Sequence, residues 1–274
     1  MTFLRFPLTN ALFLILGVFL SCLQVAHAVS PRVIGGSFAR LVPQLDRFAT
    51  LAPLEDDIAR WADIAMKAGG TKIVRQELGQ RNLPQELLDD TFLRILVRQK
   101  RMQPSEAEAL FRTLHGIPGF GSALSKSMGA SPAGTLGHLT EVRMAHQAIQ
   151  KNFKVHGIGV RFSDPNKKAD TDIDLVLEKR DALIAIEAKA YPPDAFIPLD
   201  TFRADMLTLQ VHAQSHAPRK VVSFFWITSK PIRESDWKAM EAFAQQHNVE
   251  LIAASPENGI HWVNQICCFA GAIQ

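Results

Sequence analysis

The sequence predicts an α/β protein in which a mixed sheet flanked by helices follows an all-helical region. Apolar residues recur at helical spacing through residues 50–115, which indicates amphipathic helices. Beyond Gly137 the pattern changes to the order helix, three strands, helix, strand, helix, strand. An antiparallel hairpin followed by crossover helices gives a sheet with both parallel and antiparallel neighbours and helices on its faces.

Three amphipathic helices are expected in the first region. The first two are predicted from their apolar stripes: Ile58, Trp61, Ala62 and Ala65, and then Leu88, Phe92, Ile95 and Leu96. The third is expected to open at Ser105, because Ser105 and Glu108 have the spacing of a capping box directly after Pro104.

The stretch from His115 to Gly137 holds six glycines and two prolines, a composition that breaks regular structure and predicts a plain loop. Gly116, Gly119 and Gly121 do not form a phosphate-binding loop, because no strand precedes them and no Gly-Lys-Ser/Thr follows.

The second region is expected to carry eight elements. We expect helices at 138–151, 199–216 and 233–247, and strands at 155–161, 171–178, 183–190, 220–228 and 249–253.

The N-terminus has the pattern of an export signal. Arg5 precedes an uncharged apolar run, and Ala26-His27-Ala28 is an A-x-A cleavage signal. We therefore expect a signal peptide at 1–28, a linker at 29–49, a helical region at 50–136 and an α/β domain at 137–274, in an exported, periplasmic or secreted protein. Two alternatives stay open: an uncleaved membrane anchor, and lipidation at Cys22.

Composition does not identify a ligand. An apolar fraction of 47% with 21% charged residues is typical of a globular chain. The signal removes one of the 30 basic side chains and none of the 27 acidic ones, so the mature net charge is about +2, too weak to indicate nucleic acid. Cys267 and Cys268 are adjacent and predict no disulfide framework.

The hairpin around residues 170–190 concentrates the chemistry. If its turn centres between Arg180 and Asp181, Asp174 lies opposite Glu187, and Asp172 lies opposite Lys189. Strand alternation then places those four charged side chains on one face and an apolar set on the other: Ile173, Leu175, Leu177, Ile184, Ile186 and Ala188.

Two facing carboxylates repel each other, and a divalent cation such as Mg²⁺ relieves that repulsion by binding their oxygens. Glu141, on the helix before the strands, could point a further carboxylate at the sheet. The alternatives are a solvated charged hairpin face and a surface Glu141 paired with Arg143.

These residues resemble the PD-(D/E)xK nuclease superfamily, which includes restriction endonucleases, Holliday-junction resolvases and DNA-repair nucleases. The match consists of Asp174, the Glu187-Ala188-Lys189 element, Glu141 on the preceding helix, and the order helix, three strands, helix, strand over residues 138–228. The Pro-Asp pair is absent, because Ile173 precedes Asp174.

The resemblance implies a restriction-endonuclease-like core and a role for each matched residue. Asp174 and Glu187 are expected to bind Mg²⁺, with Mn²⁺ as a substitute, and the carbonyl of Ala188 to add a ligand. Lys189 is expected to orient or deprotonate the attacking water, with its pKa depressed by the metal and by burial. Glu141 is expected to support the metal directly or through water.

Other residues are secondary candidates. Asp172 is expected to form a cross-strand salt bridge with Lys189, and Gln210 to support the site from the next helix. His212 and His216, four residues apart, are expected on a polar helix surface. A group of basic residues could contact phosphates of a nucleic acid: Lys154, Arg161, Lys167 and Lys168.

The expected function is therefore an exported metal-dependent nuclease that hydrolyses phosphodiester bonds, with DNA favoured over RNA, acting as a toxin or a scavenger. The helical region is a candidate surface for an inhibitor or a delivery partner, and a homodimer is open. The alternative is a catalytically inactive nuclease fold that binds protein or nucleic acid in the cell envelope.

Overall fold

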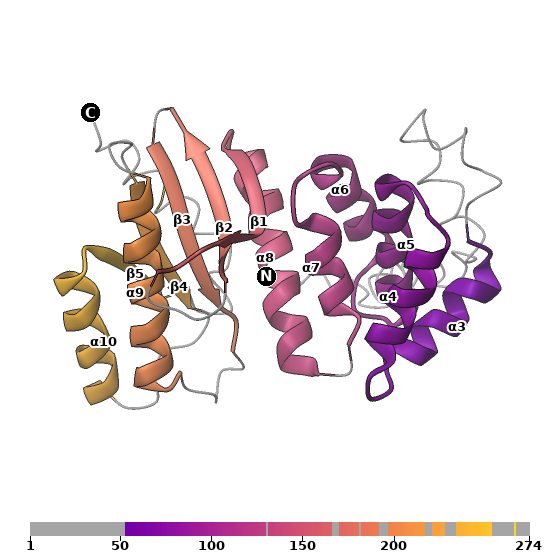
Figure 1. Ribbon diagram of the computed structural model, residues 1–274, viewed down its shortest axis with the longest axis horizontal. Helices are drawn as coiled ribbons and strands as arrows, with labels where there is room; N and C mark the ends of the chain where they lie inside the picture. Colours follow the sequence, from indigo (N-terminus) through magenta and orange to yellow (C-terminus); the bar gives the residue numbers. More distant parts are fainter. Residues whose placement is uncertain are drawn as a thin grey trace, which may run out of the picture. The chain divides into compact units, whose positions relative to one another are not determined.

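The computed structural model describes residues 53–129, 131–165, 170–180, 182–191, 197–216, 221–227, 234–253 and residue 266. Within these ranges the chain forms eight helices and one five-stranded sheet (Figure 1), which confirms a mixed α/β fold. The expected signal peptide and linker lie outside the described residues. No helix in these ranges is both long and apolar enough to cross a bilayer.

The helical region contains α3 (Glu55–Ala65), α4 (Gly70–Gln80), α5 (Gln85–Arg98), α6 (Pro104–Leu114) and α7 (Phe120–Ser127). The predicted stripe of α3 is buried throughout, and in α5 Phe92, Ile95 and Leu96 are buried while Leu88 is partly buried. The capping box is wrong: Gln103 is the N-cap of α6, and Pro104 already occupies its first turn, where its missing N–H costs nothing.

The loop expected from His115 to Gly137 is also wrong, because α7 and the first turns of α8 (Pro132–Gln150) occupy much of it. Two residues of the stretch open helices instead. Gly119 is the N-cap of α7 with φ +85°, and the Ser131 hydroxyl accepts a hydrogen bond from the backbone N–H of Gly134. The boundary expected after residue 136 therefore falls inside α8.

The sheet has the order β1 (Lys154–Phe162), β2 (Thr171–Lys179), β3 (Ala182–Lys189), β4 (Val221–Ile227) and β5 (Val249–Ala253). The first three strands are antiparallel neighbours, and β3, β4 and β5 are parallel. The parallel pairs are joined through α9 (Leu199–Ser215) and α10 (Glu234–Gln246), as parallel neighbours require. The element order predicted from the sequence is confirmed.

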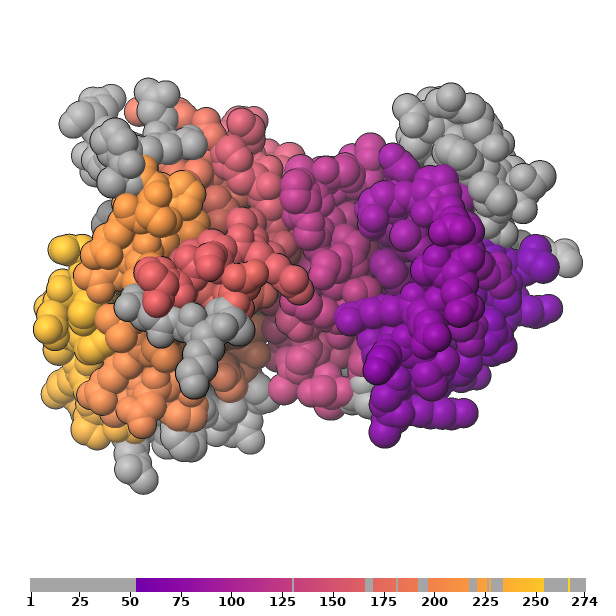
Figure 2. Space-filling view, in the orientation of Figure 1, coloured from indigo at the N-terminus to yellow at the C-terminus, as the bar shows by residue number. Residues whose placement is uncertain are grey.

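Helices cover both faces of the sheet. On one side α8 contacts β1, β2 and β3, and it also packs against α6 and α7. On the other side α9 contacts β2 through β5, and α10 contacts β5 and α9. In the space-filling view the orange and yellow atoms of α9 and α10 lie together at the left (Figure 2). Because α8 belongs to both packings, the helical region and the sheet are continuous through this helix.

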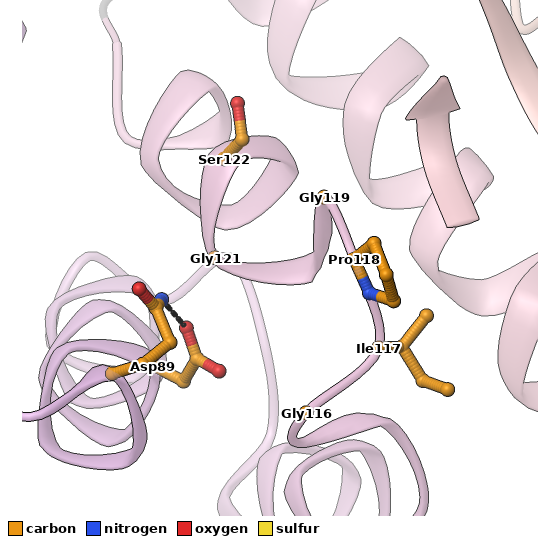
Figure 3. A pocket seen from close by; sticks show the side chains of 8 residues that line it. Asp89, Gly116, Ile117, Pro118, Gly119, Gly121 and Ser122 are labelled. Atoms are coloured by element: carbon orange, nitrogen blue, oxygen red, sulfur yellow. Dashed lines mark hydrogen bonds between the residues drawn. The ribbon is translucent and has the colours of Figure 1, made fainter. Parts of the chain in front are cut away.

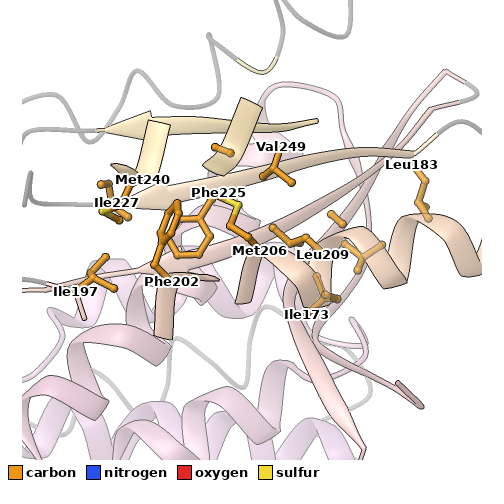
Figure 4. Close-up of a cluster of buried hydrophobic side chains, with 13 residues drawn as sticks. Ile173, Leu183, Ile197, Phe202, Met206, Leu209, Phe225, Ile227, Met240 and Val249 are labelled. Atoms are coloured by element: carbon orange, nitrogen blue, oxygen red, sulfur yellow. The ribbon is translucent and has the colours of Figure 1, made fainter. Parts of the chain in front are cut away.

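A buried apolar cluster joins α9 and α10 to the sheet (Figure 4). Phe202 of α9 meets Phe225 of β4 with ring centroids 4.9 Å apart, and burial of each such side chain contributes about 1.5–3 kcal/mol. The cluster comprises Ile173, Val176, Leu183, Ala185, Ile197, Phe202, Met206, Leu209, Phe225, Ile227, Met240, Ala244 and Val249.

The hairpin register agrees with the prediction, with pairs running from Lys179 and Ala182 to Leu175 and Ile186. The β2–β3 pairing ends there. Before Leu175, β2 pairs with β1, and after Ile186, β3 pairs with β4. The two strands thus separate just where Asp174 and Glu187 follow the last pair.

One residue departs from the predicted alternation. Ile173, expected on the face opposite Asp174, packs in the α9-side cluster, at a position where β2 is paired with β1 alone.

Candidate active site

The separation of β2 and β3 brings Asp174 and the Glu187-Ala188-Lys189 segment together. Asp174 is partly buried, and its Oδ2 accepts a hydrogen bond of 2.8 Å from the backbone N–H of Ala188. Glu187 is only 6% exposed. The backbone of β3 therefore holds the Asp174 carboxylate beside the strand that carries the other two functional groups.

Lys189 stands between two carboxylates. Its Nζ lies 2.5 Å from Glu187 Oε1 and 3.2 Å from Oδ2 of Asp205 on α9. Glu187 and Lys189 alternate in phase with Leu183 and Ala185, which pack in the cluster beneath α9. The same face of β3 thus supplies apolar core at one end and the charged group at the other.

Glu141 approaches from α8. It is 7% exposed, and its Oε1 lies 2.9 Å from Nδ1 of His138 one helical turn earlier. Its charge raises the pKa of Asp174, so the two carboxylates interact. The predicted group of Asp174, Glu187, Lys189 and Glu141 is therefore assembled from α8, β2 and β3.

Burial and mutual repulsion favour the protonated forms of Asp174 and Glu187. Burial, and then the charge of Glu141, raise the pKa of Asp174 to about 7, against the opposing effects of Lys189 and the Ala188 N–H. Burial, and then the charge of Asp174, raise the pKa of Glu187 well above its ordinary value. Carboxyls with such raised pKa values gain from a bound cation, which favours their charged form.

In the metal-free protein the pKa of Lys189 is raised, and its depression beside a bound metal stays a prediction. Burial acts to lower the pKa of Lys189, but the charges of Glu187, Asp174 and Asp205 outweigh burial and raise it above its ordinary value. Lys189 is therefore an ammonium group at every physiological pH.

The donor set fits a hard divalent cation. It consists of carboxylates, the ligands that Mg²⁺ and Mn²⁺ favour, and Oε2 of Glu187 is buried with no hydrogen-bond partner among the described residues. Within the same residues no three Asp, Glu, His or Cys side chains already form a metal-ligand group. The ammonium of Lys189 takes the place beside Glu187 that a cation would need.

Asp205 is a residue that the sequence analysis missed. On α9 it follows Phe202 by three positions and precedes Leu209 by four, so it lies on the buried stripe of the helix. An acidic residue within an apolar stripe is a signal that could have identified it.

Asp172 does not pair with Lys189 as predicted. It is in register with Arg161 of β1, it is about half exposed, and its Oδ2 lies 3.8 Å from Nζ of Lys126. The cause is again the separation of β2 from β3, which leaves Asp172 paired with β1. Arg161 is exposed beside it and remains a candidate for phosphate contact.

The remaining basic candidates are divided. Lys154 pairs with Glu178 at 3.7 Å, and in the β1–β2 register this pair lies at the far end of the strands from Asp174. The structure thus does not bring Lys154 to the site. Lys167 and Lys168 lie outside the described residues.

The polar residues of α9 have structural contacts. Oε1 of Gln210 lies 2.9 Å from Nδ1 of His247, which follows α10, so Gln210 joins two helices and is not at the site. His212 was expected on a polar surface but is 2% exposed, and its ring packs against Phe162 and His216. Burial, and then the charge of His216, lower the pKa of His212 to about 4.

A pocket of about 320 Å³ lies at the glycine-rich turn between α6 and α7 (Figure 3). Its wall includes Asp89, whose Oδ1 accepts a hydrogen bond of 2.7 Å from Gln85. A Cβ on Gly121 would lie 2.3 Å from this oxygen, which explains the glycine. The pocket shares no lining residue with the carboxylate group around Lys189.

Comparison with known proteins adds no relative: the chain matches no family model, and no curated protein matches it.

Proposed function

We propose that this protein is a metal-dependent nuclease and that the elements from α8 to β4 form a restriction-endonuclease-like core. The observation that carries the proposal is the meeting of Asp174, Glu187 and Lys189 where β2 and β3 separate. The order α8, β1, β2, β3, α9, β4 and the effect of the Glu141 charge on the pKa of Asp174 support the same interpretation of the PD-(D/E)xK resemblance.

Asp174 and Glu187 are the proposed ligands of Mg²⁺ or Mn²⁺, with Glu141 supporting them directly or through water and the Ala188 carbonyl as a further donor. When bound, such a cation lowers the pKa of water and offsets the charge that develops on a phosphodiester. Oε2 of Glu187 is buried without a hydrogen-bond partner among the described residues, and a bound cation would satisfy it.

Lys189 acts as a hydrogen-bond donor in this proposal. Its carboxylate neighbours keep it protonated, so it orients the attacking water or a phosphate oxygen and does not remove a proton. His138 lies 2.9 Å from Oε1 of Glu141 and restrains the position of that carboxylate.

The proposed substrate is nucleic acid, with DNA favoured over RNA, and the proposed place of action is outside the cytoplasm. Export separates a nuclease from the chromosome of its own cell, whether the protein acts as a toxin or as a scavenger. The helical region is the proposed surface for an inhibitor or delivery partner, and self-association as a homodimer is part of the same hypothesis.

The test is cleavage of supercoiled plasmid, linear duplex, single-stranded DNA and RNA by the purified protein, with Mg²⁺, Mn²⁺ or EDTA. We expect metal-dependent cutting that falls by at least about a hundredfold in Glu187→Gln and in Lys189→Met, because each removes a group at the reacting phosphate.

Glu178→Gln is the matched control. Glu178 is also an acid of the β2–β3 hairpin, but it pairs with Lys154 and His156 away from the site. Its variant should cut like the wild type. No cutting of any substrate by folded wild-type protein would overturn the proposal.

A second candidate function is a catalytically silent binding module. The contacts of Lys189 with both Glu187 and Asp205 favour it, because an internal ammonium can neutralise the site without a metal. This candidate predicts that Lys189→Met destabilises the fold, and that Mn²⁺ leaves the melting temperature of the wild type unchanged.

A further inference from the structure

The two carboxylates that hold Lys189 come from different elements. Glu187 lies two residues earlier on the same strand, and its Oε1 is 2.5 Å from Nζ of Lys189. Asp205 lies on α9, and its Oδ2 is 3.2 Å from the same nitrogen. One ammonium therefore bridges a strand and the helix that covers it.

The two partners differ in what else they do. Glu187 is a proposed metal ligand, and a divalent cation on its carboxylate repels the ammonium that contacts Oε1 and weakens that ion pair. Asp205 belongs to none of the positions that match the nuclease motif. When Glu187 turns to a cation, Asp205 is the partner already in place for the displaced ammonium.

Packing holds Asp205 where this exchange needs it. Its helical neighbours Phe202, Met206 and Leu209 are each 0% exposed and belong to the cluster under α9. The side chain of Asp205 is 24% exposed and that of Lys189 17%. A carboxylate on a helix anchored in this way keeps its place when Lys189 moves.

We propose that Asp205 is a positioning residue that retains the Lys189 ammonium at the active site while Glu187 exchanges that ammonium for a divalent cation. This inference rests on the proposed metal-dependent function of the same site. It assigns Asp205 a role that acts through Lys189, because among the described residues the close contact that joins Asp205 to the group is the ion pair with that lysine, although the charge of Asp205 also raises the pKa of Glu187.

The first test measures Mn²⁺ affinity by electron paramagnetic resonance, which requires no cleavage. Four proteins are compared: wild type, Asp205→Asn, Lys189→Met and the double variant. We expect Asp205→Asn to weaken Mn²⁺ binding by about tenfold, the range of coupling found in contacting charge networks. The loss arises because Lys189 then binds Glu187 more tightly and competes more strongly with the cation.

The double variant separates the explanations. If Asp205 acts through Lys189, Asp205→Asn has little effect on Mn²⁺ affinity once Lys189 is methionine. An equal weakening in both backgrounds would make Asp205 a direct ligand and overturn the proposal. A lowered melting temperature with unchanged Mn²⁺ affinity would make the ion pair merely structural and overturn it as well.

Asp200→Asn is the matched control, since Asp200 is 98% exposed in the first turn of α9 and pairs with Arg203 at 3.6 Å. It removes the same charge from the same helix and should leave Mn²⁺ affinity unchanged. Asp205→Glu should restore most of the affinity that Asp205→Asn loses.

Cleavage kinetics distinguish this inference from the proposed function. Asp205→Asn at saturating metal should lower kcat about tenfold and leave KM for DNA nearly unchanged, because Lys189 is misplaced and substrate binding is not. Suppose that the wild type binds Mn²⁺ and that the effect of Asp205→Asn depends on Lys189, but that no substrate is cut. That result would refute the proposed nuclease function and leave the role of Asp205 in place. Wild-type cutting with an unaffected Asp205→Asn variant would refute the exchange alone, and no Mn²⁺ binding would refute both.

Discussion

Two sets of buried acids lie in this protein, one in α5 and one where β2 and β3 separate, and burial is the main reason that their pKa values are raised. In α5 each acid has a polar partner one helical turn away. Gln85 donates to Asp89 at 2.7 Å, and Nε of Arg94 lies 2.9 Å from Oδ2 of Asp90. Both of these close contacts lie within one helix, and Arg94 lies in addition 3.8 Å from Glu55 of α3.

The sheet acids are arranged differently. Asp174, Glu187 and Asp205 share one lysine, and Glu141 has only a histidine as its nearest basic neighbour. Four acids thus surround one permanent cation at this place, whereas in α5 Asp90 alone pairs with a guanidinium and Asp89 has the neutral amide of Gln85. Burial of acids alone does not indicate function; an excess of buried acids around one shared cation does.

Catalysis gives the largest expected difference between the two sets. Asp174→Asn should reduce metal-dependent cleavage by at least about a hundredfold, whereas Asp89→Asn should leave the rate within a factor of about two, the scatter expected of a group outside the reaction. Single-turnover cleavage with each folded variant makes the comparison. Equal losses in both would mean that the α5 acids belong to the site and would remove the distinction.

For the free energy of unfolding we expect the reverse: a substitution in the α5 set should be costly, and one in the sheet set should be stabilising. Asp90→Ala should lower the free energy of unfolding by about 3 kcal/mol, because it leaves the largely buried Arg94 without its close partner. Asp174→Asn should raise it by on the order of 1 kcal/mol at pH 8, because it removes a charge that repels Glu141 and Glu187. Urea unfolding in EDTA measures both, and destabilisation by Asp174→Asn would show that its hydrogen bond to Ala188 outweighs the repulsion.

The smallest effect is a dependence of stability on pH. The pKa of Asp174 is about 7 in the folded protein and ordinarily 3.8, so the folded state holds this proton more tightly than the unfolded chain. Its contribution to stability is complete below pH 3.8 and is lost as the pH rises through about 7.

Asp89 and Asp90 each have a pKa of about 6, so their contribution to stability also decreases as the pH rises. That contribution is lost about one pH unit lower than the contribution of Asp174. The urea concentration at the unfolding midpoint, measured in EDTA, should therefore decrease as the pH rises from 5 to 8. Asp174→Asn should reduce that decrease only at the higher pH values. An unchanged slope in the variant would assign the effect to the helix.

The hairpin could be predicted from the sequence because its information is local. Alternating apolar residues around Arg180 favour one register, since a slip by one position would move Ile184 and Ile186 to the opposite face of the sheet. The placement of Asp174 beside Glu187 and Lys189 followed from that register, and Glu141 from its position on the helix before the strands.

The features that the sequence analysis missed depend on tertiary contacts. The glycine-rich stretch forms helices because Ser131 caps α8 and Gly121 fits against Asp89, and neither contact is visible in composition. The separation of β2 from β3, which moved Asp172 away from Lys189, leaves β2 paired with β1 and β3 paired with β4, and the alternation of apolar residues does not show where it begins. Asp205 reaches the site only through the packing of α9.

The contacts of α8 on both sides have a practical consequence for any attempt to isolate the sheet and its group of acids. The backbone N–H of Ile158 in β1 donates to the carbonyl of Pro118 at 2.9 Å, and α8 itself contacts α6, α7 and three strands while carrying Glu141. A fragment that starts at residue 137 would lack the first turn of this helix and expose its α7 contact. We expect it to aggregate, and one that starts before α3 to unfold in a single transition.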